Sequence, residues 1–255
     1  MTMNPLRIST ITGTAILNTN INLQELYSIL DVNDIIHYIE YGCDNYKGYS
    51  KKLEKKKRNK LKKKVFYNQI TTHIYHINKI INVKIFNNGH IQMTGLKDIE
   101  HTRKVLNLLL QEIMKVLPEE NKVYDISQEI YPPTIVSTNT ALINSDFDVG
   151  FEIDREVLHR EILSDGYYST YEPCIYPGVN IKYFYNPLCN KVPGICSCSG
   201  KCNGKGKDGQ CKKLTIAVFK SGKVIITGGN SLHQLDITYN FINNYLSDKK
   251  DIIKI

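Results

Sequence analysis

Apolar and polar positions alternate along the chain in a way that predicts the same order of elements twice. In the first half, β-branched and alternating segments predict strands at 6–17, 65–77, 83–86 and 89–95. Apolar spacings of three and four residues predict a helix over 23–39. A second helix is expected to begin at Asp98, as its cap, and to end before Pro118.

The second half repeats this plan. Strands are expected at 134–143, 178–186, 213–219 and 222–228. Helices are expected over 154–163, capped by Asp154, and from Ser231, which forms a capping box with Gln234. The pairs Thr94-Gly95 and Thr227-Gly228 occupy equivalent places, as do Ser9-Thr10 and Ser137-Thr138, one pair near the start of each half. We interpret the chain as a duplicated unit.

Strand alternation divides each predicted sheet into two faces. One face is aliphatic and is expected to lie against the helices. The other face is small, semi-apolar and almost free of acids, and a phenylalanine closes a strand on it in both halves, at Phe86 and Phe219. Large rings on an otherwise uncovered sheet face favour a binding partner.

Composition and charge narrow the class of protein. The chain has 255 residues, is 42% hydrophobic, and contains no apolar run near the about 20 residues of a membrane span. Its start lacks a secretory pattern, so we expect a soluble protein that is not secreted and has reduced cysteines. The net charge of +8 is concentrated in residues 50–64, which predict an arm attracted to polyanions, a solvated run without a fixed partner, or a nuclear-import signal.

A cysteine-rich segment lies at 189–211. It holds five of the seven cysteines of the chain among many glycines and lysines, and it has no apolar core of its own. Four of these thiols would suit a zinc ion, although the spacing is not a paired CxxC pattern. Disulfides and a flexible loop are the alternatives. The candidate ligands are Cys189, Cys196, Cys198, Cys202 and Cys211.

Several motifs together resemble the TATA-box-binding protein family. The segment "YEPCIYPG" at 171–178, followed by "AVFKSGKVIITGG", resembles the second repeat of that family. "KIFNNGHIQMTGLKD" resembles the matching part of the first repeat, and "TIVSTN" the strand that opens a repeat. The resemblance covers roughly residues 6–248 and is interrupted by two insertions.

The resemblance implies an α+β saddle, in which two pseudo-symmetric repeats share one curved antiparallel sheet with helices on the convex face. The first repeat would span 1–122 with a basic insertion at 47–64, and the second 123–255 with a cysteine-rich insertion at 187–213. The implied function is a transcription initiation factor that binds and bends AT-rich promoter DNA through the minor groove. A nucleic-acid or protein interaction module without TATA specificity is the alternative.

Site residues follow from the matched positions. Phe66, Phe86, Tyr176 and Phe219 would be the rings that wedge between base pairs, while Thr94 and Thr227 would contact minor-groove acceptors. The remaining groove contacts would be Gln92, Thr134, Val136 and Ile225. Tyr176 and Gln92 replace apolar family residues, and the paired asparagines of the family are absent, which puts strict TATA preference in question.

Partners and location follow from the same resemblance. We expect AT-rich double-stranded DNA, a transcription factor IIB-like protein and the RNA polymerase machinery, and no membrane. The expected location is the nucleus or, for a large DNA virus, the cytoplasmic viral factory. The sequence contains no P-loop, HExxH or GxSxG motif, so we do not expect an enzyme.

Overall fold

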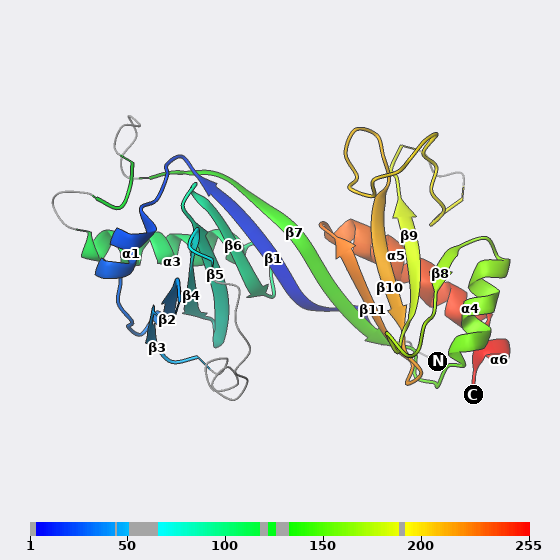
Figure 1. Cartoon of the computed structure of the whole chain (residues 1–255). Coiled ribbons are helices and arrows are strands. Elements are labelled where there is room, and N and C mark those ends of the chain that lie inside the picture. The colour runs from blue at the N-terminus through cyan, green and yellow to red at the C-terminus, as the bar shows by residue number, and fades with distance from the viewer. Residues whose placement is uncertain (1–3, 44, 51–65, 118–121, 126–132, 189–191) are drawn as a thin grey trace. The chain divides into compact units, whose positions relative to one another are not determined.

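The computed structural model describes the chain except for residues 1–3, 44, 51–65, 118–121, 126–132 and 189–191 (Figure 1). It divides into two compact units, an N-terminal unit of residues 11–141 and a C-terminal unit of residues 1–10 and 142–255. The predicted boundary at 122/123 stays a prediction. The basic segment at 51–64 lies outside the described residues, and so does Cys189.

Antiparallel strands in the N-terminal unit follow the order β3-β2-β4-β5-β6-β1. The strands are β1 (Arg7–Leu17), which begins in the C-terminal unit, β2 (Ile36–Tyr41), β3 (Asn45–Gly48), β4 (Gln69–His76), β5 (Lys79–Phe86) and β6 (His90–Leu96). The helices are α1 (Leu23–Ile29) and α3 (His101–Val116).

The C-terminal unit arranges its strands in the order β7-β11-β10-β9-β8, again antiparallel. The strands are β7 (Ile135–Asp148), which begins in the N-terminal unit, β8 (Tyr168–Thr170), β9 (Val179–Tyr185), β10 (Lys212–Val218) and β11 (Lys223–Gly229). The helices are α4 (Arg155–Ser164), α5 (Leu232–Asp248) and α6 (Lys250–Ile253). Apart from β3 and α6, the elements follow one another in the same order in both units.

Each unit has its own core between the sheet and the helices. In the C-terminal unit, alternate residues of β10 and β11 are fully buried on the side that α5 covers, including Leu214, Ile216 and Val224 (Figure 1). In the N-terminal unit, Val83 and Met93 are buried in the same way on the α3 side. The predicted α+β class with antiparallel strands is confirmed, and so is the division of the strands into a buried and a more open face.

The helix predicted over 23–39 is wrong in its second half. Helix α1 ends at Ile29, and the chain then turns and enters β2 at Ile36. The turn is stabilised by Asn33, whose side-chain oxygen accepts hydrogen bonds from the backbone N–H groups of Ile35 and Ile36 at 2.8 Å. Short polar side chains compete with helical hydrogen bonds in this way, and the β-branched and aromatic residues that follow suit a strand.

Two of the three predicted helix caps are confirmed. The Asp154 carboxylate accepts from the N–H groups of Glu156 and Val157, and the Ser231 hydroxyl accepts from Gln234. Asp98 is not the cap of α3, because that helix begins at His101 and Asp98 accepts from the N–H of Glu100 in the preceding turn. None of the described helices is long and apolar enough to cross a membrane.

Candidate nucleic-acid interface and four-cysteine cluster

Two aromatic rings meet at one end of the C-terminal unit. Tyr176 lies in the connection from β8 to β9, and Phe219 directly follows β10; their ring centroids are 5.8 Å apart in an edge-to-face arrangement. Tyr176 is exposed and Phe219 is partly exposed. Gly178 lies beneath them, since a Cβ atom there would be 2.9 Å from Tyr176 Cε1 and 3.2 Å from Phe219 Cε1. The structure therefore brings two predicted ring residues together.

Contacts from α4 fix the segment that carries Tyr176. The backbone N–H of Tyr176 donates to Glu172 O at 2.9 Å. Arg155 donates through Nη1 to the carbonyl of Pro177, and its guanidinium lies 5.3 Å from the centre of the Tyr171 ring. Sequence reasoning missed Arg155, because nothing in the helical pattern of 154–163 shows which loop that side chain will reach.

The open face of the C-terminal sheet carries a polar row across four neighbouring strands. Lys182 pairs with Thr215, Thr215 pairs with Thr227, and the Thr227 hydroxyl donates to the side-chain oxygen of Asn144. Lys182 also donates to the Thr215 hydroxyl at 3.0 Å. Burial, and then the nearby charge of Lys213, lower the pKa of Lys182. Thr227 was predicted for this face, but Lys182 and Asn144 were not.

A second row passes through Ile225, the other predicted residue of β11. Ile225 is 37% exposed and pairs with Ala217 on one side and Asp146 on the other. Asp146 is an acid on a face predicted to be almost free of acids. Its charge is matched by Arg7, whose guanidinium donates to it at 2.7 Å. Arg7, Asp146, Phe219 and Ile225 line one hollow of about 740 Å³ in this unit.

The N-terminal unit has an equivalent arrangement. Thr94 pairs with Asn82 and Thr12, and Gln92 pairs with Lys84 and Thr14. These side chains occupy the partly exposed positions of their strands, opposite the buried aliphatic ones. Neither the Thr94–Asn82 pairing nor the Gln92–Lys84 pairing was predicted, because the partners of a strand depend on register.

The remaining predicted residues of this unit are exposed or partly exposed. Phe86 ends β5 and is partly exposed, and Phe66, just before β4, is 54% exposed. In the described part of the chain no ring contact joins these two, unlike Tyr176 and Phe219. Val136 on β7 is 63% exposed, and Thr134, just before β7, is also exposed.

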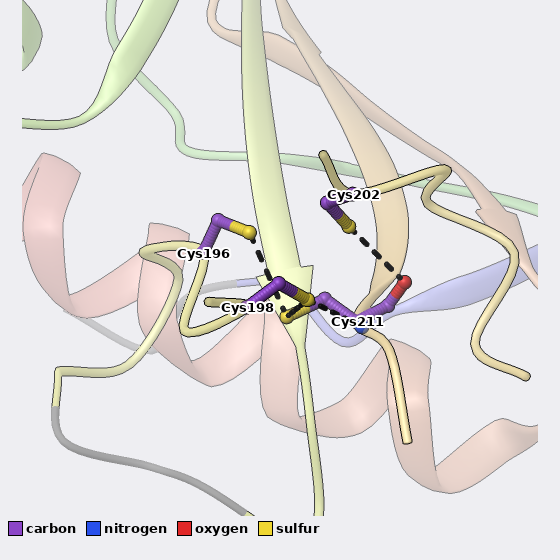
Figure 2. Close-up of side chains that lie close together, drawn as sticks. All are labelled: Cys196, Cys198, Cys202 and Cys211. Atoms are coloured by element: carbon purple, nitrogen blue, oxygen red, sulfur yellow. Dashed lines mark hydrogen bonds between the residues drawn. The ribbon is translucent and has the colours of Figure 1, made fainter. Parts of the chain in front are cut away.

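Four thiols come together in the connection from β9 to β10. Cys196, Cys198, Cys202 and Cys211 place their sulfur atoms within 4.8 Å of one another (Figure 2). The Sγ atoms of Cys196 and Cys198 lie 3.9 and 3.5 Å from that of Cys211. Cys211 is buried, and the other three are partly buried. Four of the five predicted ligands are thus gathered in an arrangement that can hold a metal ion, and the fifth, Cys189, is outside the described residues.

The thiols perturb one another's ionisation. Burial raises the pKa of the Cys211 thiol. Hydrogen bonds from Ser197, Cys198 and Cys196 lower it by more than burial raises it, so that its pKa is about 7. For Cys198, the backbone N–H of Cys211 lowers the pKa, while burial and the neighbouring thiols raise it, to about 12 overall. One thiolate is therefore favoured, and a cation is needed before all four ionise together.

Both units thus present an open, antiparallel sheet face with aromatic residues at strand ends, backed by helices. No protein-family model matches the sequence. A protein named "TATA-box-binding protein-like" from Acanthamoeba polyphaga mimivirus is 30% identical over 268 residues, which cover 98% of this chain and 67% of that relative. Among solved structures, Methanococcus jannaschii TBP matches with a TM-score of 0.53 and 17% identity, covering 95% of this chain and 98% of the other.

The structural match identifies the fold as that of TBP. The chain belongs to the TATA-box-binding protein-like family.

Proposed function

We propose that this protein is a TATA-box-binding-protein-like transcription initiation factor that binds and bends AT-rich promoter DNA through the minor groove. The observation that carries the proposal is the Tyr176–Phe219 ring pair at the end of an open sheet face. Apolar rings that enter the minor groove unstack base steps and bend the duplex, and TBP itself is a known example of this mode of binding.

Polar rows on the sheet face support groove binding. The minor groove of an A·T pair presents only acceptors, adenine N3 and thymine O2. Donors on the open face suit these acceptors: Thr94 and Lys182 supply them, and Thr227 does so once its hydroxyl turns away from Asn144. The amide of Gln92 and the side chains of Val136 and Thr134 complete the proposed contact set. These contacts distinguish A·T-rich from G·C-rich DNA better than one A·T order from another.

A nucleic-acid or protein module without TATA specificity is the second candidate. It is favoured by the residues at three positions: Gln92 stands where the family has an apolar contact, and Thr134 and either Leu6 or Thr10 stand where it has asparagine. Asn144 approaches the same face from β7 and contacts Thr227, so an amide is still present in that row.

The other parts of the proposal concern partners, location and cofactor. A viral TATA-box-binding-protein-like relative supports action with a transcription factor IIB-like protein and RNA polymerase, in a nucleus or a viral factory. We assign no catalytic role. Zinc is the proposed cofactor of the four-cysteine cluster, because its ligands are all sulfur. This cluster lies at the opposite end of β10 from Phe219, so zinc has no part in the proposed ring insertion.

Bending of end-labelled duplexes tests the proposal directly. Fluorescence transfer between the two ends should rise on binding AT-rich duplex and much less on GC-rich duplex of equal length. Replacing both Phe86 and Phe219 with alanine should reduce the bent fraction about tenfold, because unstacking is no longer compensated by ring contacts. Tyr49→Ala, at another exposed ring, is the matched control and should bend DNA normally. Equal affinity for both duplexes without bending would favour the second candidate.

A further inference from the structure

The connection from β9 to β10 has almost no core of its own. Within residues 192–211, only Gly194 and Cys211 are buried, while Val192 and Ile195 are exposed. Its ends are attached to the sheet by backbone hydrogen bonds, from Phe184 to Gly194 and from Lys213 to Gly204. Hydrophobic packing therefore contributes little to the conformation between these ends, and another interaction must order it.

Sulfur positions in the cluster fit one small tetrahedral ion. Zinc–sulfur bonds of about 2.3 Å in a tetrahedron place neighbouring sulfurs about 3.8 Å apart. The sulfur–sulfur separations from Cys211, 3.5 Å to Cys198 and 3.9 Å to Cys196, lie on either side of that value. A disulfide would need about 2.05 Å, and all four cysteines are free.

We propose that Cys196, Cys198, Cys202 and Cys211 bind one zinc ion as a closed, structural site, and that this ion orders the segment 192–211. The donor set has four sulfurs and no carboxylate or imidazole, which favours a soft or borderline metal over magnesium or calcium. With four protein ligands the ion has no open position for water or substrate. Each thiol releases its proton to solvent when it binds the ion.

Hydrogen-bond donors around the sulfurs match this assignment. The backbone N–H groups of Gly204 and Cys211 donate to the sulfurs of Cys202 and Cys198, both at 3.4 Å. The Asn186 amide lies 3.9 Å from the Cys211 sulfur and also donates to Gly209 O at 3.1 Å. Donors of this kind orient ligands and stabilise thiolates in metal sites.

Charge in the segment also suits a bound ion. Zinc with four thiolates has a formal charge of −2. The stretch 192–213 contains Asp208 as its one acid and five lysines, which are Lys201, Lys205, Lys207, Lys212 and Lys213. These lysines offset the charge of the metal complex, so the liganded segment avoids a buried net negative charge.

Metal content of the full-length protein tests the ligand set. Protein purified without added metal should contain about one zinc per chain. Cys198→Ser and Cys202→Ser should each lose most of the zinc; both are partly exposed, so these changes spare the buried Cys211. Cys189→Ser and Cys174→Ser are the matched controls and should keep the ion. Iron in place of zinc, or zinc retained by both ligand variants, would overturn the assignment.

Proteolysis tests what the ion does. Trypsin cleavage after Lys201, Lys205 and Lys207, followed by mass spectrometry, should be at least about tenfold faster after chelation or in Cys198→Ser, because metal binding is coupled to folding of such segments. Cobalt substituted for zinc should give the visible spectrum of a tetrahedral thiolate site. Unchanged cleavage after metal removal, or disulfides among the four cysteines in freshly purified protein, would refute the proposal. Neither readout involves DNA, so failure here leaves the proposed DNA bending untouched.

Discussion

Gly178 shows how a single residue shapes the proposed DNA contact. A methyl group added at this position would overlap the Tyr176 ring and crowd the Phe219 ring. The tips of the two rings can shift at the surface with little loss of folding stability. The distance between the rings, however, decides whether both fit a base step. The absence of a side chain at Gly178 therefore matters more for geometry than for stability.

Gly178→Ala should accordingly separate bending from folding. We expect the free energy of unfolding to change by less than about 1 kcal/mol, since the atoms that must move belong to partly exposed side chains. Fluorescence-detected bending of AT-rich DNA should fall several-fold. Gly200→Ala, where an added methyl meets nothing within 4 Å, is the control and should change neither quantity. Normal bending by Gly178→Ala would remove the ring pair from the mechanism.

Asp165 is a residue whose charge links two helices. It follows α4 and accepts hydrogen bonds from Tyr245 at 2.8 Å and Lys249 at 3.1 Å, both at the end of α5. The Tyr245 hydrogen bond, and then that of Lys249, lower the pKa of Asp165. A carboxyl whose pKa is lowered in the folded state stabilises the fold at pH values above its ordinary, unfolded-state pKa. This stabilisation is lost as the pH falls through the pKa of the folded state.

Replacing Asp165 with asparagine should thus lower the free energy of unfolding by an amount that depends on pH. At pH 7 we expect the free energy of unfolding to fall by about 0.5–1 kcal/mol, a small figure because the site is partly exposed and screened. Urea denaturation at a series of pH values should show the difference from the natural protein narrowing below about pH 4. Tyr245→Phe removes the larger contribution alone and should show the same narrowing. A difference independent of pH would contradict the assigned charge effect.

At the level of elements, close approach between β1 and α3 depends on Gly13. A Cβ atom at this position would lie 2.7 Å from Thr102 Oγ1 and 2.8 Å from Thr102 Cγ2. Thr102 is buried in the first turn of α3, and its hydroxyl has no hydrogen-bond partner among the described residues. Gly13 of β1 therefore packs directly against the branched side chain of Thr102 in α3, and a larger residue at position 13 has no room.

A double-mutant cycle tests this packing. Gly13→Ala alone should reduce the free energy of unfolding by about 1–3 kcal/mol through overpacking. Thr102→Ala removes both clashing atoms, so the pair of substitutions should cost clearly less than the sum of the two single changes. Thermal or chemical unfolding of all four proteins measures the coupling. Strict additivity would mean that the helix moves away from the strand at no cost.

Sequence patterns predicted most elements but not the partners that the elements acquire. The alternation in 213–219 and 222–228 was enough to place Phe219 and Ile225 on the open face, because side-chain direction has a period of two. The row that joins Lys182, Thr215 and Thr227 needed the register between strands, which no single strand contains. The helix predicted over 23–39 failed because apolar spacing alone does not reveal the turn that Asn33 stabilises between the end of α1 and the start of β2.

The cysteine cluster is another case in which the sequence predicted a feature but not the contacts that form it. Density of cysteine predicted a metal site, since a glycine- and lysine-rich segment cannot form a core. The spacing of the cysteines along the chain did not show which of them would be ligands. The connection loops back, so that Cys211, just before β10, meets Cys196 and Cys198 from the earlier part of the connection. The chain reverses in a tight turn at Lys207–Gln210, where the N–H of Gln210 donates to Lys207 O and both Asp208 and Gly209 have positive φ, and this turn is not readable from the cysteine positions.

For the whole molecule, charge is divided between a nearly neutral body and one basic segment. Residues 50–64 contain ten of the 33 lysines and arginines of the chain and one of its 25 acids. The proposed ring contacts and polar rows are short-range and depend on DNA geometry, whereas a basic segment attracts phosphates of any sequence. Affinity and bending should therefore reside in different parts of the chain.

Replacing residues 50–64 with a neutral segment of equal length should separate DNA affinity from DNA bending. Binding to AT-rich duplex at low salt should weaken at least about tenfold, and the slope of log affinity against log salt should decrease by about 0.9 for each phosphate that the segment no longer neutralises. The bend in the DNA that remains bound should be unchanged, because the rings of Phe86 and Phe219 are intact. The Phe86 and Phe219 alanine variant is the converse control, with reduced bending and an unchanged salt slope. If neutralising the segment abolishes bending while the ring variant still bends DNA, the basic segment and not the sheet face is the element that deforms the duplex.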